Sequence, residues 1–324
     1  MKPRLGIAMA IAAAALGFAL PASAQDYPSR TVTLVVPYPP GGGVDAMARL
    51  VAEKLSAGLG AQVIVDNRGG GSGNVGMRTV AKAAPDGYTL VLGHTGSISI
   101  NPTLYANAGY DPRVDFAPIG LMASMPVALL AHPSFPPKTI GDVIALAKRE
   151  PGKLNIGTSA VGTGGYLSAE LFKSMANLDV TIVPYKGTGQ VMNDLLGGHV
   201  PVAFGVLPPA LGNLSAGTLR AIAVLSPTRF SLLPDVPTAA ESGFPGFVSV
   251  LHYGLLAPAG TPKPIIDRLN KELRALVAKE DVQKRIHSEG GDAMTSSPQE
   301  YAEDIDREER KWGALIRKLN LKIE

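Results

Sequence analysis

The sequence predicts an α/β protein with two lobes and a hinge between them. Two series of alternating strand and helix patterns, one from Thr31 and one from Lys153, indicate two mainly parallel sheets with crossover helices. Long apolar runs near 126–132 and at 248–257 have the length and position of strands that cross between lobes. We therefore expect a ligand cleft between two lobes that close on it.

Residues 1–24 have the features of an export signal. Lys2 and Arg4 form a basic start, an alanine-rich apolar run follows, and Ala22-Ser23-Ala24 is a cleavage motif. The apolar run is short for a membrane span. We expect cleavage after Ala24 and a periplasmic mature chain that begins at Gln25.

The composition excludes several classes of protein. The chain has no cysteine, which excludes disulfides and metal–thiolate sites. Without Lys2 and Arg4, 28 of the 30 basic residues remain against 27 acidic ones, and no basic run stands out. We therefore expect no nucleic-acid partner.

The first series of elements predicts lobe 1. Strand patterns at 31–36, 62–66 and 88–92 are separated by helix patterns that begin at Val44 and Asn74. We assign residues 25–125 and 255–324 to lobe 1. Its C-terminal part contains a helix after Thr261-Pro262 and a final helix that begins with a capping box, Ser297-Pro298-Gln299-Glu300.

A glycine-rich turn, Pro37 to Asp45, connects the first strand to the first helix. Glycines let a backbone approach a ligand, and the free N–H groups at a helix start favour an anion. Two interpretations remain open: an anion site, or a turn that only connects two elements. We expect Asp45 to cap or brace this turn.

Residues 126–254 are assigned to lobe 2. Short apolar strands at 117–122 and 126–131 lead into it, and Thr139 with Asp142 predicts the start of a helix. A strand at 153–157 then ends in a second glycine-rich turn, 158–165, before the next helix. Further strands are expected at 180–184, 200–206 and 219–225.

Two motif matches lack a residue that their chemistry needs, and a third motif is absent. Gly71 to Gly76 matches G-x-G-x-x-G, but the next strand ends without the acidic residue that binds a ribose. Gly157 to Gly162 has Walker A spacing, but Thr163 stands where the lysine belongs. No G-x-S-x-G occurs, so the common serine-hydrolase turn is missing.

The five histidines do not form a metal-binding pattern. They have no partner at metal-ligand spacing, and no H-E-x-x-H occurs. We expect neither a metal nor a cofactor. His94 merits attention because it lies at the carboxyl end of a predicted strand, where ligands bind in α/β sheets.

Ordered motifs along the mature chain resemble the Bug family, the extracytoplasmic receptors of tripartite tricarboxylate transporters. The matches are 27–30 (YPSR), 37–45 (PYPPGGGVD), 65–71 (VDNRGGG), 84–90 (APDGYTL), 101–105 (NPTLY), 183–187 (VPYKG), 233–238 (LPDVPT) and 253–262 (YGLLAPAGTP). The resemblance implies a two-lobe periplasmic binding protein of type II-like fold that closes on a small carboxylate.

The resemblance also implies which residues bind the ligand. In such receptors the turn after the first strand holds a carboxylate, partly through water, and the second lobe adds hydroxyls and N–H groups. The positions implied here are Tyr38, Pro40, Gly41, Gly42, Gly43, Asp45, Thr95, Ser97, Thr158, Ser159, Gly162, Thr163, Tyr185, Lys186, Gly187 and Gly205.

Two departures from the family pattern bear on specificity. Pro201 and Gly205 replace aspartates that the family usually has in this strand. If Gly205 faces the cleft, a carboxylate that could meet a ligand ammonium is missing, and we expect a preference for ligands without an amine. His252 stands where the family often has tryptophan, so we expect an altered hinge or pocket wall.

We conclude from the sequence that the chain is an exported solute receptor without catalytic activity. It would deliver its ligand to the membrane permease subunits of a tripartite transporter. A second hypothesis is a sensory receptor that docks a membrane sensor kinase. A third, a periplasmic enzyme, is disfavoured because no nucleophile–base pair or metal set is found. We expect a monomer, as is usual for receptors that open and close.

Overall fold

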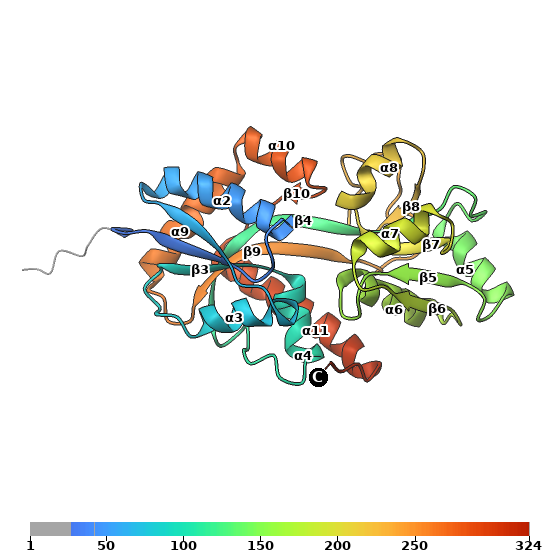
Figure 1. Cartoon of the computed structure of the whole chain (residues 1–324), viewed down its shortest axis with the longest axis horizontal. Coiled ribbons are helices and arrows are strands. Elements are labelled where there is room, and N and C mark those ends of the chain that lie inside the picture. The colour runs from blue at the N-terminus through green and yellow to red at the C-terminus, as the bar shows by residue number, and fades with distance from the viewer. Residues whose placement is uncertain (1–26, 42, 324) are drawn as a thin grey trace, which may run out of the picture.

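Figure 1 shows two α/β halves side by side in the computed structural model, which describes residues 27–41 and 43–323. The predicted leader 1–24, its cleavage site after Ala24, and Gly42 lie outside the described residues. Within these two ranges, no helix combines the length and the apolar character needed to cross a membrane.

Lobe 1, the half on the left of Figure 1, contains a mixed sheet with the strand order β2-β1-β3-β9-β4. Strand β1 is parallel to β2 and β3, whereas β9 is antiparallel to β3 and to the first part of β4. The strands are β1 (Val32–Val36), β2 (Val63–Asn67), β3 (Thr89–His94), β4 (Phe116–Ala131), β9 (Val250–Pro258) and β10 (Asp292–Ala293), which pairs with β4.

Helices cover both faces of this sheet. Leu34 and Val36 of β1 pack with α2, α9 and α10, whereas Val35 points the other way and packs with α3 and α11. This two-sided burial explains why β1 is apolar throughout. The helices are α2 (Gly43–Leu59), α3 (Asn74–Ala81), α4 (Asn101–Leu104), α9 (Lys263–Val277), α10 (Glu280–Ser288) and α11 (Pro298–Lys318), with helical turns η1 (Gly71–Gly73) and η2 (Gly96–Ile100).

Lobe 2 repeats this plan on a second sheet. Strand β5 lies between β6 and β7 and is parallel to both, and β7 and β8 are antiparallel to the last part of β4. Val202 and Phe204 of β7 pack with α5 and α6, while Ala203 packs with α7. The elements are β5 (Asn155–Thr158), β6 (Thr181–Pro184), β7 (Val202–Val206), β8 (Arg220–Val224), α5 (Ile140–Arg149), α6 (Gly164–Ala176), α7 (Thr188–Leu196), η3 (Pro208–Ala210) and α8 (Leu211–Ser215).

The prediction of two short strands at 117–122 and 126–131 was wrong, because β4 runs without a break through both. Its residues up to Pro126 pair with β9, and from Val127 onward they pair with β7 and β8. Pro126 has no N–H to give to a ladder, and it lies where β4 changes partner. Val127 N donates to Ser249 O at 3.1 Å, so a second segment passes between the lobes beside β4.

Helix α11 extends from lobe 1 toward lobe 2 (Figure 1), and its side chains contact both lobes. Trp312 and Ile316 are buried in one cluster with Leu104 of lobe 1 and Leu167 of lobe 2. Lys318 Nζ donates to Ser174 Oγ of α6 at 2.7 Å. The capping box predicted at Ser297 and the one at Thr139 are both confirmed.

Candidate functional site

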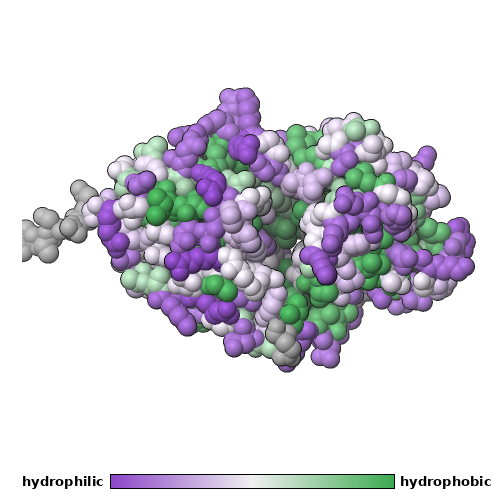
Figure 2. Space-filling model, in the orientation of Figure 1, coloured by the Kyte–Doolittle hydropathy of each residue, from purple (hydrophilic) through white to green (hydrophobic). Residues whose placement is uncertain are grey.

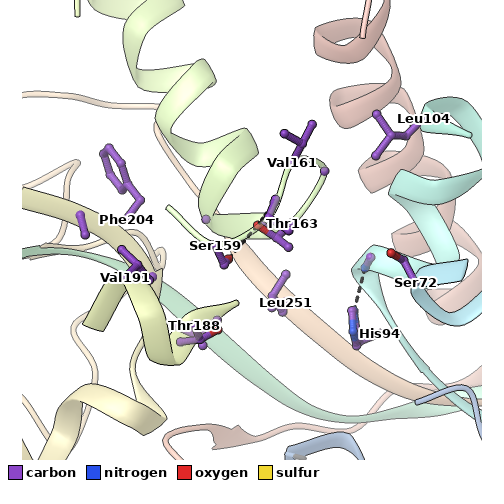
Figure 3. A pocket seen from close by; sticks show the side chains of 18 of the residues that line it. Ser72, His94, Leu104, Ser159, Val161, Thr163, Thr188, Val191, Phe204 and Leu251 are labelled. Atoms are coloured by element: carbon purple, nitrogen blue, oxygen red, sulfur yellow. Dashed lines mark hydrogen bonds between the residues drawn. The ribbon is translucent and has the colours of Figure 1, made fainter. Parts of the chain in front are cut away.

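A cavity of about 380 Å³ lies between the lobes, and residues of both lobes line it. Figure 2 shows hydrophobic surface in the hollow between the two halves, whereas hydrophilic side chains cover much of their outer ends. Figure 3 shows Ser72 and His94 on one side of the cavity and Ser159, Thr163 and Val191 on the other. No aspartate, glutamate, lysine or arginine is found among the described residues that line it.

The turn after β5 forms the polar part of the lobe 2 wall. Thr163 is the N-cap of α6, and its Oγ1 accepts from Tyr166 N at 3.4 Å and donates to Ala160 O at 2.7 Å. Because the Thr163 hydroxyl already donates its proton to Ala160 O, Ser159 Oγ is the donor in the 2.8 Å hydrogen bond between the Ser159 and Thr163 hydroxyls. The first N–H groups of α6 have no intrahelical acceptor, so Gly164 and Gly165 can offer theirs to the cavity.

Glycine is needed at Gly165, in the first turn of α6, because the backbone of β7 lies very close. A Cβ at Gly165 would lie 2.7 Å from Phe204 O of β7, and one at Gly164 would lie 2.8 Å from the side-chain Cδ2 of Leu251 in β9. Gly162 has a φ of 82°, which favours glycine. These glycines bring the positive end of the α6 dipole to the cavity wall.

The turn after β1 is arranged differently. Asp45 is 4 % exposed, and its carboxylate accepts from Gly41 N at 3.0 Å, Arg49 Nε at 3.0 Å and Asn67 Nδ2 at 2.9 Å. Burial alone would raise the pKa of Asp45, but these hydrogen bonds outweigh it and lower the pKa to about 2. The protein's own carboxylate thus occupies the described part of this turn.

Five of the sequence-predicted site residues line the cavity: Tyr38, Ser159, Gly162, Thr163 and Gly205. The structure does not bring Pro40, Gly41, Gly43 and Asp45 to it. Pro40, Gly41 and Gly43 are exposed, while Gly41 and Asp45 border a separate open depression together with Arg49 and Arg285. Gly42 lies outside the described residues.

Thr95 and Ser97, expected among the ligand-binding residues, are buried in the helical segment after β3. Thr95 Oγ1 accepts from His252 N at 2.8 Å, and Ser97 Oγ donates to His94 O at 3.2 Å. Thr158 is also buried, and its Oγ1 donates to Ser159 O. These three hydroxyls shape the backbone beside the cavity without lining it.

The stretch Tyr185 to Gly187 lies beside the cavity rather than in its wall. Tyr185 Oη donates to Asp194 Oδ2 at 2.6 Å, and burial with this carboxylate raises the Tyr185 pKa to about 12. Lys186 is exposed, and Gly187 is the N-cap of α7. The next residue, Thr188, does line the cavity.

Gly205 faces the cavity, but His252 does not. A Cβ at Gly205 would meet only Leu130 Cδ1, at 3.9 Å, so open space lies before it. His252 Nδ1 bonds Asp304 Oδ2 of α11 at 2.8 Å. His252 therefore ties a crossing strand to α11.

His252, Asp304 and Glu308 are close enough to suggest a metal site, but their charges are already matched. Arg307 pairs with Asp304, and Lys311 Nζ lies 3.7 Å from Glu308 Oε2. Burial lowers the Lys311 pKa, and its Nζ donates to Val248 O at 2.7 Å. This cluster is an ion-pair network between α11 and a crossing segment.

Several residues that line the cavity were not predicted from the sequence to bind the ligand, namely Ser72, His94, Asn101, Tyr105 and Thr188. His94 had a usable signal, its place at the carboxyl end of β3. The others depend on contacts between segments far apart in sequence. Tyr105 Oη, for example, donates to Ser72 Oγ at 2.7 Å.

Comparisons with known proteins agree on one family. The model of the tripartite tricarboxylate transporter family receptor matches residues 47–321. The chain is 33 % identical to protein BugT of Bordetella pertussis, over 99 % of both chains. It is similar to the solved periplasmic binding protein BugD, with 35 % identity, 92 % of this chain and 100 % of that one covered, and a TM-score of 0.75.

Two similar structures contain carboxylates. An R. palustris protein solved with adipate is 36 % identical, with 92 % of this chain and 100 % of that chain covered and a TM-score of 0.79. MatC from Rhodopseudomonas palustris, with bound malate, is 34 % identical, with 90 % and 100 % covered and a TM-score of 0.75. These relatives are binding receptors, not enzymes.

Proposed function

The chain belongs to the family of tripartite tricarboxylate transporter receptors, and from this premise we propose that it is an exported receptor that closes on a small carboxylate and delivers it to membrane permease subunits. The proposal includes removal of residues 1–24 after Ala24. The adipate and malate bound to two similar structures support a carboxylate ligand.

The observation that carries this proposal is the start of α6 at the cavity between the lobes, whose described lining has no charged side chain. The N–H groups of Gly164 and Gly165 point out of the helix start, where a carboxylate is favoured. Hydrogen bonds to a charged group contribute about 1.5–3 kcal/mol each, so a few of them support micromolar affinity after ordering costs.

Five residues are proposed to contact the ligand: Tyr38, Ser159, Gly162, Thr163 and Gly205. We also propose that residues 25–125 and 255–324 move together as one rigid body, and that residues 126–254 move as the other. The two crossing segments would act as the hinge, because the strand pairings change between Pro126 and Val127. A closed receptor would then present both lobes to the permease.

A thermal-shift screen of residues 25–324 tests the proposal, after unfolding and refolding to remove any copurified ligand. The panel contains dicarboxylates, tricarboxylates, aromatic acids and acidic amino acids. An acid at a hundred times its dissociation constant should stabilise the protein by about 2.7 kcal/mol. If no acid shifts the melting temperature, and native mass spectrometry finds no retained ligand, the proposal is wrong.

A further inference from the structure

We propose that His94 is a specificity-determining residue that donates its Nε2–H to an oxygen acceptor of the ligand. The ligand would therefore carry a carboxylate or similar acceptor at its lobe 1 end, and no ammonium there. This inference rests on the proposed function and adds the residue and the chemistry that select the ligand.

The tautomer of His94 follows from its backbone contact. Gly96 N donates to His94 Nδ1 at 2.8 Å, so Nδ1 uses its lone pair and the proton of the neutral ring is on Nε2. Burial lowers the pKa of His94 to about 4. The ring is therefore neutral at ordinary pH and presents one donor, Nε2–H.

The position of the ring is fixed by its neighbours. Tyr38 stacks on it with ring centroids 5.0 Å apart and planes within 8°, and Tyr253 packs at 5.5 Å. A Cβ at Gly96 would lie 2.5 Å from the ring, so glycine is needed for the backbone to reach Nδ1. Figure 3 shows His94 at the cavity with its bond to the adjacent backbone.

The neighbouring donors on this wall are already used within the protein. Asn101 Nδ2 donates to Ser72 O and to Asn74 Oδ1, both at 2.9 Å. Tyr38 Oη donates to Ser72 O at 3.3 Å, and Tyr105 Oη donates to Ser72 Oγ. In the described part of the chain no atom accepts from His94 Nε2, which leaves this N–H for the ligand. Ser72 lies on the same side of the cavity.

The opposite wall of the cavity, in lobe 2, also disfavours a ligand that carries an ammonium. The N–H groups at the start of α6 are donors too, and Gly205 supplies no carboxylate. An ammonium on the ligand would thus meet donors on both walls and no negative side chain. Burial of an ammonium without a carboxylate partner is unfavourable, so an amine-free acid should bind better than its amino analogue.

Isothermal titration with succinate and adipate, each paired with its 2-amino analogue, tests the inference on residues 25–324. We expect the amine-free acid of each pair to bind more tightly. His94→Phe keeps a stacked ring but removes the donor, and it should weaken binding roughly 10- to 100-fold. His94→Gln, which can place an N–H near the same point, should recover most of the loss, and His132→Phe, outside the cavity, should have no effect.

Equal binding by wild type and His94→Phe, or tighter binding of the amino analogues, would overturn the inference while the receptor function stands. Absence of binding by wild type to every acid in both this set and the screen would instead contradict the receptor function. Should His94→Phe not fold, ¹⁵N NMR of the wild-type imidazole decides. The expected signal is a neutral Nε2–H ring, with slower exchange of this proton on adding acid. An Nδ1–H ring would overturn the inference.

Discussion

The two glycine-rich turns look alike in sequence but differ in what their N–H groups bind. After β1, the Asp45 carboxylate accepts from Gly41 N and is held by Arg49 and Asn67. After β5, the N-cap is the neutral Thr163, and the turn opens on the cavity between the lobes. A glycine turn becomes an anion site only where the chain has not supplied its own anion.

A carboxylate placed at the second turn should make it resemble the first turn. We expect it to cause the largest loss of ligand affinity. Aspartate is a good N-cap, so Thr163→Asp should keep α6 folded. Its negative charge would lie where the ligand carboxylate binds, and we expect affinity to fall by roughly 100-fold or more, about 2.7 kcal/mol. Isothermal titration measures this, with Thr163→Ser as a control that should retain most of the affinity.

Gly165→Ala tests the close packing of the second turn. The new Cβ would lie 2.7 Å from Phe204 O, a backbone atom that cannot move cheaply. We expect a loss of about 2–3 kcal/mol in the free energy of unfolding, as for an overpacked core site. Urea denaturation measures it, and an unchanged midpoint would show that α6 does not approach β7 this closely.

Asp45→Asn tests the first turn, with a smaller loss of stability. The carboxylate's bonds to Gly41 N and Arg49 weaken, and we expect a loss of roughly 1–2 kcal/mol near pH 7. Because the folded pKa is depressed to about 2, the carboxylate stabilises above its usual pKa near 4 and this contribution is lost as pH falls from there toward 2.

The difference in stability between wild type and Asp45→Asn should therefore shrink over that acid range. Ligand affinity should stay within about threefold of wild type, which corresponds to less than 1 kcal/mol. A tenfold loss of affinity in Asp45→Asn would mean that the first turn also binds the ligand.

Gly43→Ala should change the free energy of unfolding least. Nothing lies within 4 Å of the Cβ position at Gly43, and alanine favours a helix over glycine. We expect a gain of up to about 1 kcal/mol in the free energy of unfolding. The opposite signs for Gly43→Ala and Gly165→Ala, measured in the same urea series, would separate a glycine needed for close packing from one that is not.

The sequence predicted the α/β fold, the two helix capping boxes and the family because each depends on local patterns or ordered motifs. It missed the continuity of β4, since Pro126 resembles a strand end unless its change of partner is known. It placed Thr95 and Ser97 among the ligand-binding residues, whereas the chain turns helical there and buries both residues.

The cavity wall was harder to predict than the fold. Ser72 and Tyr105 are brought together by the sheet order, and no local pattern links them. The Asp45 carboxylate is likewise held within the protein by a hydrogen bond from Asn67, at the end of the neighbouring strand β2. Sequence showed which turns could bind an anion, but only tertiary contacts show which turn is free to do so.

A crystal structure of residues 25–324 with the tightest acid from the screen tests the central claim most directly. We predict a ligand carboxylate within hydrogen-bonding distance of Gly164 N or Gly165 N, with the Asp45 carboxylate still on Gly41 N. A carboxylate at the turn after β1, with Asp45 displaced from Gly41 N, would contradict the account.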